Sequence, residues 1–493
     1  MSDSKRVLIR CDAGPGIGAG HMMRCMTLAG ALARRGFSPT VLALPGSREA
    51  VAGMVHSHVE LVEAAAADDA ATLRGLAPAG CTLAIVDSYR LDAHYLEALE
   101  GWAERRFVLQ DRPAQRLTAE IVLDPTFGRR PGDYAASTAS STLLLTGPDY
   151  ALVRPAFAKT RGQVLARRTI SPVKRLLVAL GGGDAGRTLD VVLDGIGQSG
   201  LAIEVHVAGR LPDCLPARLG VARLVAHGAV ADMQDLIGHC DLAIGAAGGS
   251  AWERATLGLP TLMIELAENQ ADNISGLVEA GAAQSLGRAR DLDAARVASA
   301  LNDLAADSGR RARMAMKAAL MCDGLGAGRV ALAVHPRVTR DGLAVTLRRA
   351  TAADSRTMFA WQQRREVRRF TPHPLPPTWE EHSAWLEQRL AHPQAGTFDI
   401  IEHGDDAAGV LRLDPLPAER WNMRLEPGAL VVSILVDPDR HGLGIAAAAL
   451  AAARDLVPVV PFYAEVLPGN AASHSLFRNT GYAQLKDQLY RFG

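Results

Sequence analysis

Short apolar runs alternate with helical segments along residues 5 to about 335. The apolar runs read RVLIRCDA, TVLAL, CTLAIVDS, RFVLQD, EIVLD and TLLLTG in the first part, and KRLLVALGGG, AIEVHVAG, RLVAHG, DLAIGAAGG and PTLMIEL in the second. Runs that are apolar throughout and end in Gly or Asp are typical of parallel strands buried on both faces. Because helical segments such as MQDLIGHC and ADNISGLVEAG lie between them, the order predicts doubly wound α/β units.

This alternation lapses twice, and each lapse predicts a domain boundary. The first lapse is PDYALVRPAFAKTRGQVLARRTISPVKR, near residue 160, and the second is VHPRVTRDG at residues 334–342. We therefore expect two Rossmann-like domains at 1–160 and 161–335 and a third domain at 343–493. Two doubly wound domains that face each other would bind a ligand at the carboxyl ends of their strands.

The third domain has a different pattern. The strand LAVTLRRA leads into two helical segments, DSRTMFAWQQRREVRRF and TWEEHSAWLEQRLAHP. The strands FDIIEH, AAGVLRLD and LVVSILVDP follow, and then come the helix GLGIAAAALAAARDL, the strand PFYAEVL and a last helix. This order predicts an α+β domain of roughly 150 residues.

Composition adds several expectations. Fifty-three basic residues balance 53 acidic ones, so we expect no nucleic-acid partner and no anionic membrane surface. No stretch reaches the roughly 20 apolar residues of a membrane span, and the opening MSDSKRVLIR lacks the apolar core of a signal peptide. Six scattered cysteines without a CxxC pair predict reduced thiols in a cytoplasmic protein. Dispersed histidines and carboxylates predict no metal site.

Three Gly-rich turns each precede a helical segment. They are GPGIGAGH with Gly18 and Gly20, GGGDAGRT with Gly182, and GAAGGSAWE with Gly248, Gly249 and Ser250. Unpaired N–H groups at such a helix start suit a phosphate, although a single Gly-rich turn is equally often only a tight turn. Three in one chain predict a diphosphate site. The first turn is not the spaced GxGxxG dinucleotide fingerprint, since no acidic residue follows the second strand to hold a ribose.

Four further side chains could carry chemistry near these turns. Glu253 is predicted in the first turn of a helix, where it either binds ribose hydroxyls or caps the helix. His21 stands at the start of the first helix, where it packs, caps or moves a proton. Asp12 and Asp87 follow strands, and each either orients His21, binds a sugar hydroxyl or caps a helix.

Several separated motifs in residues 5–335 resemble one enzyme group. They are IRCDAGPGIGAGHMMRC, GPDYALVRPAF, GGGDAGRT, AAGGSAWERATLGLP, ENQADN and DGLGAGRV. Together they resemble the MurG-like glycosyltransferase group and, more narrowly, the UDP-sugar hydrolases of pseudaminic acid synthesis. The resemblance implies a two-domain GT-B fold and release of UDP from a 2,4-diacetamido-2,4,6-trideoxy-altropyranose by water.

The resemblance also implies roles for individual residues. His21 matches the catalytic histidine, an imidazole that can act as general base at neutral pH. Glu253 matches the ribose carboxylate, and a glycine stands at position 183 where the family usually has serine. The diphosphate loop and the polar cluster beside the sugar match, respectively, Gly248, Gly249 and Ser250, and Asn269, Gln270 and Asn273.

A further Gly-rich turn, in ILVDPDRHGLGIAAAALAAARD, resembles the acetyl-CoA loop of the GNAT acetyltransferases. Histidine replaces the usual Arg or Gln of that loop, and the matched positions are Val436, His441, Gly442, Gly444 and Ala446. Downstream, Asn470 matches the asparagine that contacts the pantetheine arm. Phe477 stands where a tyrosine often protonates the thiolate, which leaves His474, Tyr482 or solvent as the proton donor. Glu465 is the candidate for orienting or deprotonating the acceptor amine.

The helices FAWQQRREVRRF and EEHSAWLEQRL resemble those of acetyltransferases that act on nucleotide-sugar amines. Their arginines either meet a UDP diphosphate or form a solvated face. In this pathway N-acetylation precedes hydrolysis, so the resemblance implies two consecutive steps on one chain, with UDP-sugars and acetyl-CoA as small-molecule partners. Three alternatives stay open: a true glycosyltransferase, one half acting as a binding module without turnover, and a sugar of the legionaminic series.

Overall fold

The computed structural model describes residues 5–14, 17–51, 59–168, 172–181, 186–211, 215–457 and 460–493. Residue contacts divide the chain into two compact units. The first unit comprises Met1–Phe157 and Arg167–Ala327, and the second comprises Ala158–Ala166 and Gly328–Gly493. Among the described residues, no helix is long and apolar enough to cross a membrane.

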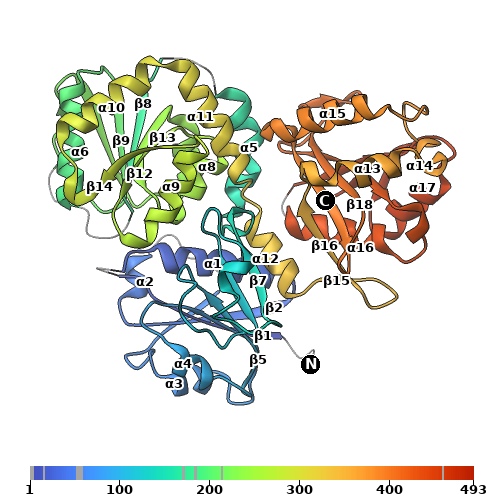
Figure 1. The fold of residues 1–493 in the computed structure, drawn as a ribbon, viewed down its shortest axis with the longest axis horizontal. Helices are drawn as coiled ribbons and strands as arrows, with labels where there is room; N and C mark the ends of the chain where they lie inside the picture. Colours follow the sequence, from blue (N-terminus) through green and yellow to red (C-terminus); the bar gives the residue numbers. More distant parts are fainter. Residues whose placement is uncertain are drawn as a thin grey trace. The chain divides into compact units, whose positions relative to one another are not determined.

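The first unit begins with a seven-stranded parallel sheet in the order β3-β2-β1-β4-β5-β6-β7. Its strands are β1 (Lys5–Cys11), β2 (Phe37–Ala43), β3 (Glu60–Glu63), β4 (Cys81–Asp87), β5 (Ala103–Leu109), β6 (Ile121–Asp124) and β7 (Leu143–Thr146). The helices between them are α1 (Gly20–Ala33), α2 (Ser47–Ala50), α3 (Ala70–Gly75) and α4 (Ala93–Glu97) (Figure 1). The strand order reverses between β1 and β4, and such a switch point leaves a crevice at the carboxyl ends of the strands.

A second seven-stranded sheet follows in the order β10-β11-β9-β8-β12-β13-β14, in which only β10 is antiparallel among the described strands. Its strands are β8 (Arg175–Ala179), β9 (Glu204–Ala208), β10 (Arg218–Leu219), β11 (Ala222–Gly228), β12 (Leu242–Ala246), β13 (Thr261–Glu265) and β14 (Gln284–Arg288). The helices are α6 (Gly186–Ser199), α7 (Met233–His239), α8 (Gly249–Thr256), α9 (Ala271–Glu279), α10 (Ala294–Ala306) and α11 (Ser308–Met321), whereas α5 (Pro155–Arg167) and α12 (Gly326–Val334) belong mostly to the second unit. Here the order reverses between β8 and β12.

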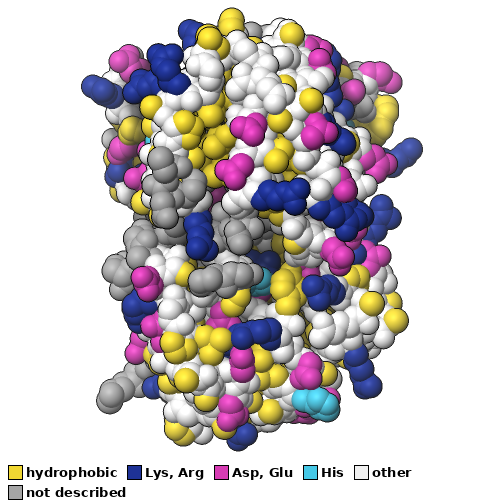
Figure 2. All heavy atoms as spheres, turned by 90° about the vertical axis from the view of Figure 1, so that its left-hand side faces the viewer, with side chains coloured by type: hydrophobic (Ala, Val, Ile, Leu, Met, Phe, Trp, Pro, Cys, Tyr) yellow, Lys and Arg dark blue, Asp and Glu magenta, His cyan; other side chains and the backbone are white. Residues whose placement is uncertain are grey.

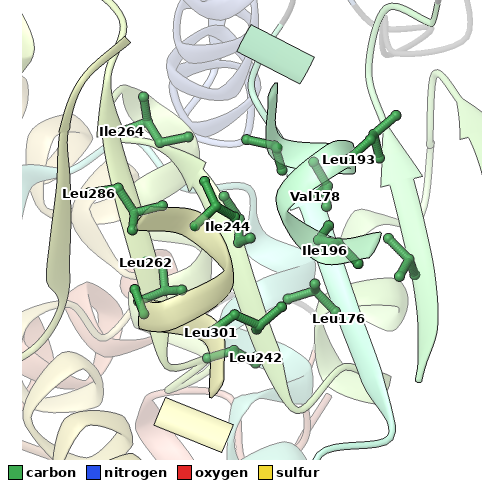
Figure 3. Close-up of a cluster of buried hydrophobic side chains, with 14 of the residues drawn as sticks. Leu176, Val178, Leu193, Ile196, Leu242, Ile244, Leu262, Ile264, Leu286 and Leu301 are labelled. Carbon is green, nitrogen blue, oxygen red and sulfur yellow. The ribbon is translucent and has the colours of Figure 1, made fainter. Parts of the chain in front are cut away.

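The core of the second sheet shows why the continuous apolar runs become strands. Leu176 and Val178 of β8 lie beside Leu242 and Ile244 of β12, with side chains of α6 and α10 packed onto them (Figure 3). Residues two apart share one face of a strand, and the intervening residues are also buried because helices cover the opposite face. A strand that is buried on both faces needs an unbroken apolar run, as the sequence has.

The second unit contains a mostly antiparallel sheet in the order β15-β16-β17-β18-β21-β22-β24-β23. Its strands are β15 (Arg337–Val338), β16 (Ala344–Arg349), β17 (Thr397–His403), β18 (Asp406–Pro415), β21 (Leu430–Val436), β22 (Phe462–Glu465), β23 (Ala483–Lys486) and β24 (Leu489–Phe492), and β19 (Glu419–Arg420) pairs separately with β20 (Met423–Arg424). The helices are α13 (Ser355–Gln362), α14 (Arg365–Arg368), α15 (Trp379–Ala391), α16 (Ile445–Leu456) and α17 (Ala471–Asn479). The continuous helix expected over DSRTMFAWQQRREVRRF is therefore wrong, because Arg364 has extended backbone between α13 and α14.

Candidate functional site

The helix α1 places His21 at the switch point of the first sheet. The helix begins at Gly20, so His21 is its second residue. The side chains of Met22 and Met26 in this helix are buried, and Sγ of Cys25, one turn after His21, donates to Oδ2 of Asp87 at 3.4 Å. Asp87 is the last residue of β4, which pairs with β1. The turn before α1 reverses at Gly18, whose positive φ of 79° favours glycine.

His21, Asp87 and Arg24 form one hydrogen-bonded cluster. The Nδ1 atom of His21 lies 2.6 Å from Oδ1 of Asp87. Arg24 approaches the same carboxylate with two nitrogens, its Nε donating to Oδ2 at 2.6 Å and its Nη2 donating to Oδ1 at 2.5 Å. The Asp87 side chain is 1% exposed and that of His21 is 16% exposed. The carboxylate of the cluster is therefore buried, whereas the imidazole is partly exposed to solvent.

The charge state of Asp87 fixes the proton on His21. Burial opposes ionisation of Asp87, but the charges of Arg24 and His21 overcome that effect and hold its pKa well below the ordinary value. An ionised carboxylate only accepts hydrogen bonds, so Nδ1 of His21 carries a proton and donates it to Asp87. The hydrogen-bond network thus assigns the lone pair of the neutral ring to Nε2. An imidazole in this tautomer can accept a proton at Nε2.

Arg24 is a site residue that the motifs alone do not mark. It lies three residues after His21 on the same helix, and residues three apart share a helix face. Its Nη2 lies 3.1 Å from Nδ1 of His21. The three-residue spacing from His21 is therefore the feature of the sequence that could have indicated Arg24.

Tyr89 connects the imidazole to the second sheet. Its ring meets the His21 ring edge to face, with centroids 5.1 Å apart. Its hydroxyl donates to Oδ2 of Asp111 at 2.5 Å and accepts from Nδ2 of Asn269 at 2.9 Å. Asn269 also donates to Asp111 at 3.1 Å. Asn269 lies in the short 3-10 helix Glu268–Gln270 after β13, so these bonds join the two halves of the first unit.

Asp12 does not orient His21, contrary to one of the expected roles. Its carboxylate pairs with the fully buried Arg10 at 2.6 Å and with Arg90 at 2.6 Å. It also accepts from the backbone N–H of Leu44. Burial opposes its ionisation, but these partners hold the pKa of Asp12 below its usual value. Asp12 therefore belongs to an ion-pair network beside the cluster, and neither it nor Asp87 caps a helix.

The second Gly-rich loop described by the structure joins β12 to α8. Gly248 is the residue before the helix, Gly249 is its first residue and Ser250 its second. Glu253 is the fifth residue, so its expected place in the first turn is wrong and it does not cap the helix. Instead Glu253 forms an ion pair with Arg154, in which Nη2 of Arg154 lies 3.0 Å from Oε1 of Glu253. Burial raises the pKa of Glu253 despite this partner.

A cavity of about 90 Å³ lies between the two halves of the first unit. Gln270 and Asn273 hold the loop at its edge: Oε1 of Gln270 accepts from the N–H of Ala247, and Nδ2 of Asn273 donates to the carbonyl of Ala247. Asn273 also accepts from the N–H of Phe127. The cavity lining comprises Arg24, Leu109, Gln110, Asp111, Leu123, Pro125, Thr126, Leu152, Ala247, Gly248, Gly249, Trp252, Asn269, Gln270 and Asn273.

The expected site residues of the first unit thus fall into two groups. His21 and Asp87 lie together at the first sheet, while Gly248, Gly249 and the amide side chains of Asn269, Gln270 and Asn273 line the cavity and Ser250 and Glu253 follow in α8. Arg24 belongs to both groups because it lines the cavity and contacts His21. Gly20 begins α1, and Gly182 lies outside the described residues.

In the second unit, the strands β21 and β22 pair only at their beginnings. Leu430 and Val431 face β22, whereas β21 continues to Val436. The Gly-rich turn follows this separated end and leads into α16, where Ala446 is the second residue. Gly442 and Gly444 have φ values of 84° and 90°, and a Cβ built on either would meet nothing within 4 Å. Open backbone before a helix start fits a pyrophosphate.

His441 and Asn470 have structural contacts of their own. Nε2 of His441 lies 3.1 Å from the carbonyl oxygen of Val436, which closes the turn. The side chain of Asn470 accepts from the N–H of Ser473 and so caps α17. Glu465 is exposed at the end of β22 and accepts from Nε1 of Trp421 at 3.2 Å. These contacts leave the catalytic assignments of this half as predictions.

Phe477 of α17 stands where a tyrosine was expected as proton donor, and the aromatic residues around it show which hydroxyl groups lie nearby. Phe477 is buried and packs against Tyr482 and Tyr490. Tyr482 is also buried, which raises its pKa to about 12. Nδ1 of His474 lies 2.7 Å from the hydroxyl of Tyr490. A hydroxyl therefore does reach this region, although from β24 rather than from α17.

The basic helix face is partly neutralised within the second unit. Arg364 donates to Asp439 through both terminal nitrogens, at 3.0 and 2.9 Å. Arg368 donates to the side chain of Gln362 and to the carbonyl of Leu375.

Of the described residues, no group of three or more His, Cys, Asp or Glu side chains could hold a metal ion. Along the side of the molecule in Figure 2, basic and acidic side chains are interspersed.

Residues 344–483 match the family model described as acetyltransferase (GNAT) domain. Over 154 residues, 30% of this chain, the sequence is 27% identical to the spore coat polysaccharide biosynthesis protein SpsG of Bacillus subtilis, covering 44% of that protein. An uncharacterized protein of Methanocaldococcus jannaschii is 18% identical over 269 residues, which are 52% of this chain and 55% of that protein. The chain thus spans about half the length of the curated relatives that it matches.

Two solved structures are also similar. MurG of Acinetobacter baumannii is 14% identical, with a TM-score of 0.48 over 67% of this chain and 99% of that chain. The ribosomal L7/L12 acetyltransferase RimL, solved with coenzyme A, is 17% identical, with a TM-score of 0.25 over 30% of this chain and 93% of that chain. The expected order of domains is confirmed: two doubly wound α/β sheets, parallel except for β10, precede a GNAT acetyltransferase domain.

Proposed function

We propose that the chain is a bifunctional nucleotide-sugar enzyme in which the first unit hydrolyses a UDP-sugar. The substrate is UDP-2,4-diacetamido-2,4,6-trideoxy-β-L-altropyranose, and the products are UDP and the free sugar. The observation that carries this proposal is the cluster of His21, Asp87 and Arg24. It leaves Nε2 of the imidazole as the proton acceptor, and Arg24 of the same cluster lines the cavity that Gly248 and Gly249 also line.

The proposed reaction uses one water molecule. The water gives a proton to Nε2 of His21 while its oxygen bonds to the anomeric carbon, and the bond from that carbon to the UDP oxygen breaks. The resulting imidazolium donates through Nδ1 to Asp87, whose negative charge stabilises it. The N–H groups of Gly248, Gly249 and Ser250 face the charge that grows on the departing UDP. Afterwards the proton passes to solvent and His21 is restored.

Glu253 is the proposed partner of the ribose hydroxyls. Its carboxylate lies one helical turn beyond the loop and is held by Arg154. A ribose whose phosphates rest on the loop would bring its hydroxyls toward the following turn of α8. Asn269, Gln270 and Asn273 line the cavity together with the loop glycines, and the sugar would lie there.

The GNAT domain is proposed to acetylate the 4-amino group of UDP-4-amino-4,6-dideoxy-N-acetyl-altrosamine. Val436, His441, Gly442, Gly444, Ala446 and Asn470 would hold acetyl-CoA, which supplies the activated acetyl group. Glu465 would orient the amine or accept its proton. Because this product is the proposed substrate of the first unit, the two steps would be consecutive.

Isotope labelling tests the hydrolysis directly. The full chain is incubated with the UDP-sugar in H₂¹⁸O and without an acceptor, and the products are weighed by mass spectrometry. Attack at the anomeric carbon puts the label in the free sugar. Label in UDP, or no release of UDP, contradicts the proposal, and the latter is the result that a glycosyltransferase would give.

A histidine pair provides the matched control. His21→Ala should abolish UDP release, whereas His94→Ala changes a solvent-exposed histidine of the same domain and should leave the rate unchanged. With acetyl-CoA and the 4-amino substrate, His21→Ala should still accumulate the acetylated UDP-sugar. A legionaminic-type substrate with a higher kcat/KM would reassign the sugar and keep both reactions.

A further inference from the structure

Arg254 is a buried cation beneath the loop that joins β12 to α8. The residue is 1% exposed. Its Nη2 donates to the carbonyl of Ala246, the last residue of β12, at 2.5 Å. Its Nη1 donates to Oγ of Ser250, the second residue of α8, at 3.1 Å. The guanidinium therefore spans both ends of the loop Ala247–Gly249.

This cation has no carboxylate partner among the described residues. Its two hydrogen bonds go to neutral oxygens, and its Nε is buried without a partner. The neighbouring Glu253 forms its ion pair with Arg154 instead. Burial lowers the pKa of Arg254 to about 10, although the charge of Glu253 opposes this shift. The one carboxylate at this end of the second sheet is thus paired with Arg154 and leaves Arg254 without an ion-pair partner among the described residues.

The surrounding backbone makes room for the guanidinium. Gly245 lies in β12 beneath it, and a Cβ at that position would come within 2.8 Å of Nη1 of Arg254 and of the carbonyl oxygen of Ala179. An unpaired buried charge is costly, and an apolar side chain of similar size would cost less. A charge kept under such conditions is explained if an anion binds close by and completes the pair.

We propose that Arg254 is the fixed counter-charge for the diphosphate of the bound UDP-sugar, acting through Ser250 and the loop above it. This inference rests on the proposed function, which puts the diphosphate at the loop. The N-terminus of α8 contributes its partial positive charge to the same place. The cavity lined by Ala247, Gly248 and Gly249 provides the space for the anion. Arg254 is thus a positioning residue rather than one that touches the reacting atoms.

The test compares three ligands of decreasing charge. Binding of UDP, UMP and uridine to the full chain is measured by calorimetry, together with the melting temperature of the unliganded protein. Arg254→Met should weaken UDP binding by about tenfold or more, UMP binding by less, and uridine binding hardly at all. Without ligand, Arg254→Met should melt at the same temperature or higher, because an unpaired buried charge has been removed. Arg254→Lys should recover most of the UDP affinity.

Arg168 supplies the matched control. It is another desolvated arginine of the first unit, and burial lowers its pKa to about 10 as well. Its guanidinium donates to the carbonyls of Leu257, Cys240 and Ile237 and so serves the fold. Arg168→Met should lower the melting temperature and leave UDP affinity unchanged. If Arg254→Met is too unstable to purify, Ser250→Ala and Arg254→Lys give the same comparison across the three ligands.

The outcomes separate the two proposals. Equal UDP affinity of Arg254→Met and the unaltered chain overturns the role of Arg254, and so does an equal loss for uridine and UDP. Either result leaves the proposed hydrolysis intact if the unaltered chain binds and releases UDP. Failure of the unaltered chain to bind UDP overturns the proposed function itself.

Discussion

Nδ1 of His21 and Oδ1 of Asp87 lie 2.6 Å apart, although the two residues are 66 positions apart in the sequence. One comes from the start of a helix and the other from the end of a strand that pairs with the strand before that helix. The parallel topology alone brings them to the same edge of the sheet. The carboxylate then sets both the orientation and the tautomer of the ring, which is the basis of the first prediction.

Asp87→Asn should lower kcat for UDP release by about 10²- to 10⁴-fold and change KM little. An asparagine amide can donate to Nδ1, so the ring proton would move to Nε2 and block the base. Steady-state rates of UDP release measure the effect. Asp92→Asn is the control, since Asp92 only accepts from the backbone at the start of α4 and asparagine caps equally well. Equal rates for both variants would exclude this role of Asp87.

Acid should destabilise the first unit through Asp87. Its pKa in the folded chain lies below the ordinary value of 3.8, because Arg24 and His21 outweigh the effect of burial. A depressed pKa contributes stability above the unfolded value and loses it as the pH falls toward the folded one. The free energy of unfolding in urea should therefore drop below about pH 4, and Asp87→Asn should flatten that drop. Parallel curves for the two proteins would show that other carboxylates carry the effect.

Asn269→Ala should raise KM for the UDP-sugar by about three- to tenfold, because it removes the two hydrogen bonds to Tyr89 and Asp111. Asn269 lines the cavity where the sugar would lie, so the loss of these hydrogen bonds should weaken substrate binding. Initial rates over a range of substrate concentrations give KM and kcat separately. Asn479→Ala removes one exposed hydrogen bond in the second unit and should change neither. An unaltered KM for Asn269→Ala would count against a role of this side chain in sugar binding.

Gly444→Ala should weaken acetyl-CoA use and spare UDP release. The φ of 90° at Gly444 costs an alanine about 1–2 kcal/mol, and relaxation of that strain would move the N–H groups before α16. The KM for acetyl-CoA, followed by thiol release, should rise about tenfold or more. Gly404→Ala, at a turn with φ of 63°, carries the same strain away from the proposed loop. Similar KM values for both glycine variants would contradict the proposed acetyl-CoA loop.

Much of the fold could be predicted from sequence because the buried strands are unbroken apolar runs. The strands that the pattern does not predict are short: β3, β10, β14, β15 and β23 lie at sheet edges, β24 lies next to an edge, and β19 and β20 form a separate pair. The segment ELVE of β3, for example, has only two apolar residues. Edge strands bury less surface and so leave a weaker pattern. The break at Arg364 also has no Gly or Pro to mark it, and the arginine binds Asp439, 75 residues away.

The site could be predicted where its residues belong to local turns and not where distant residues meet. His21 and the loop before α8 stand at strand-to-helix turns, which the sequence marks with glycines. The contact between Tyr89, Asp111 and Asn269 joins residues up to 180 positions apart, for which one sequence gives no signal. The sequence could not tell whether Asp12 contacts His21, because a carboxylate after a strand looks the same whether it meets a histidine or a buried arginine.

The bonds of Tyr89 tie the geometry of the base to the closeness of the two sheets. Its hydroxyl is held from both halves of the first unit, while its ring rests against His21. If the halves separate to admit a bulky nucleotide, the hydroxyl loses Asn269 and the imidazole loses its neighbour's support. His21 would then be fully positioned to accept a proton from water only after the UDP-sugar has been enclosed between the two halves. This order would prevent hydrolysis of a substrate that is only partly bound.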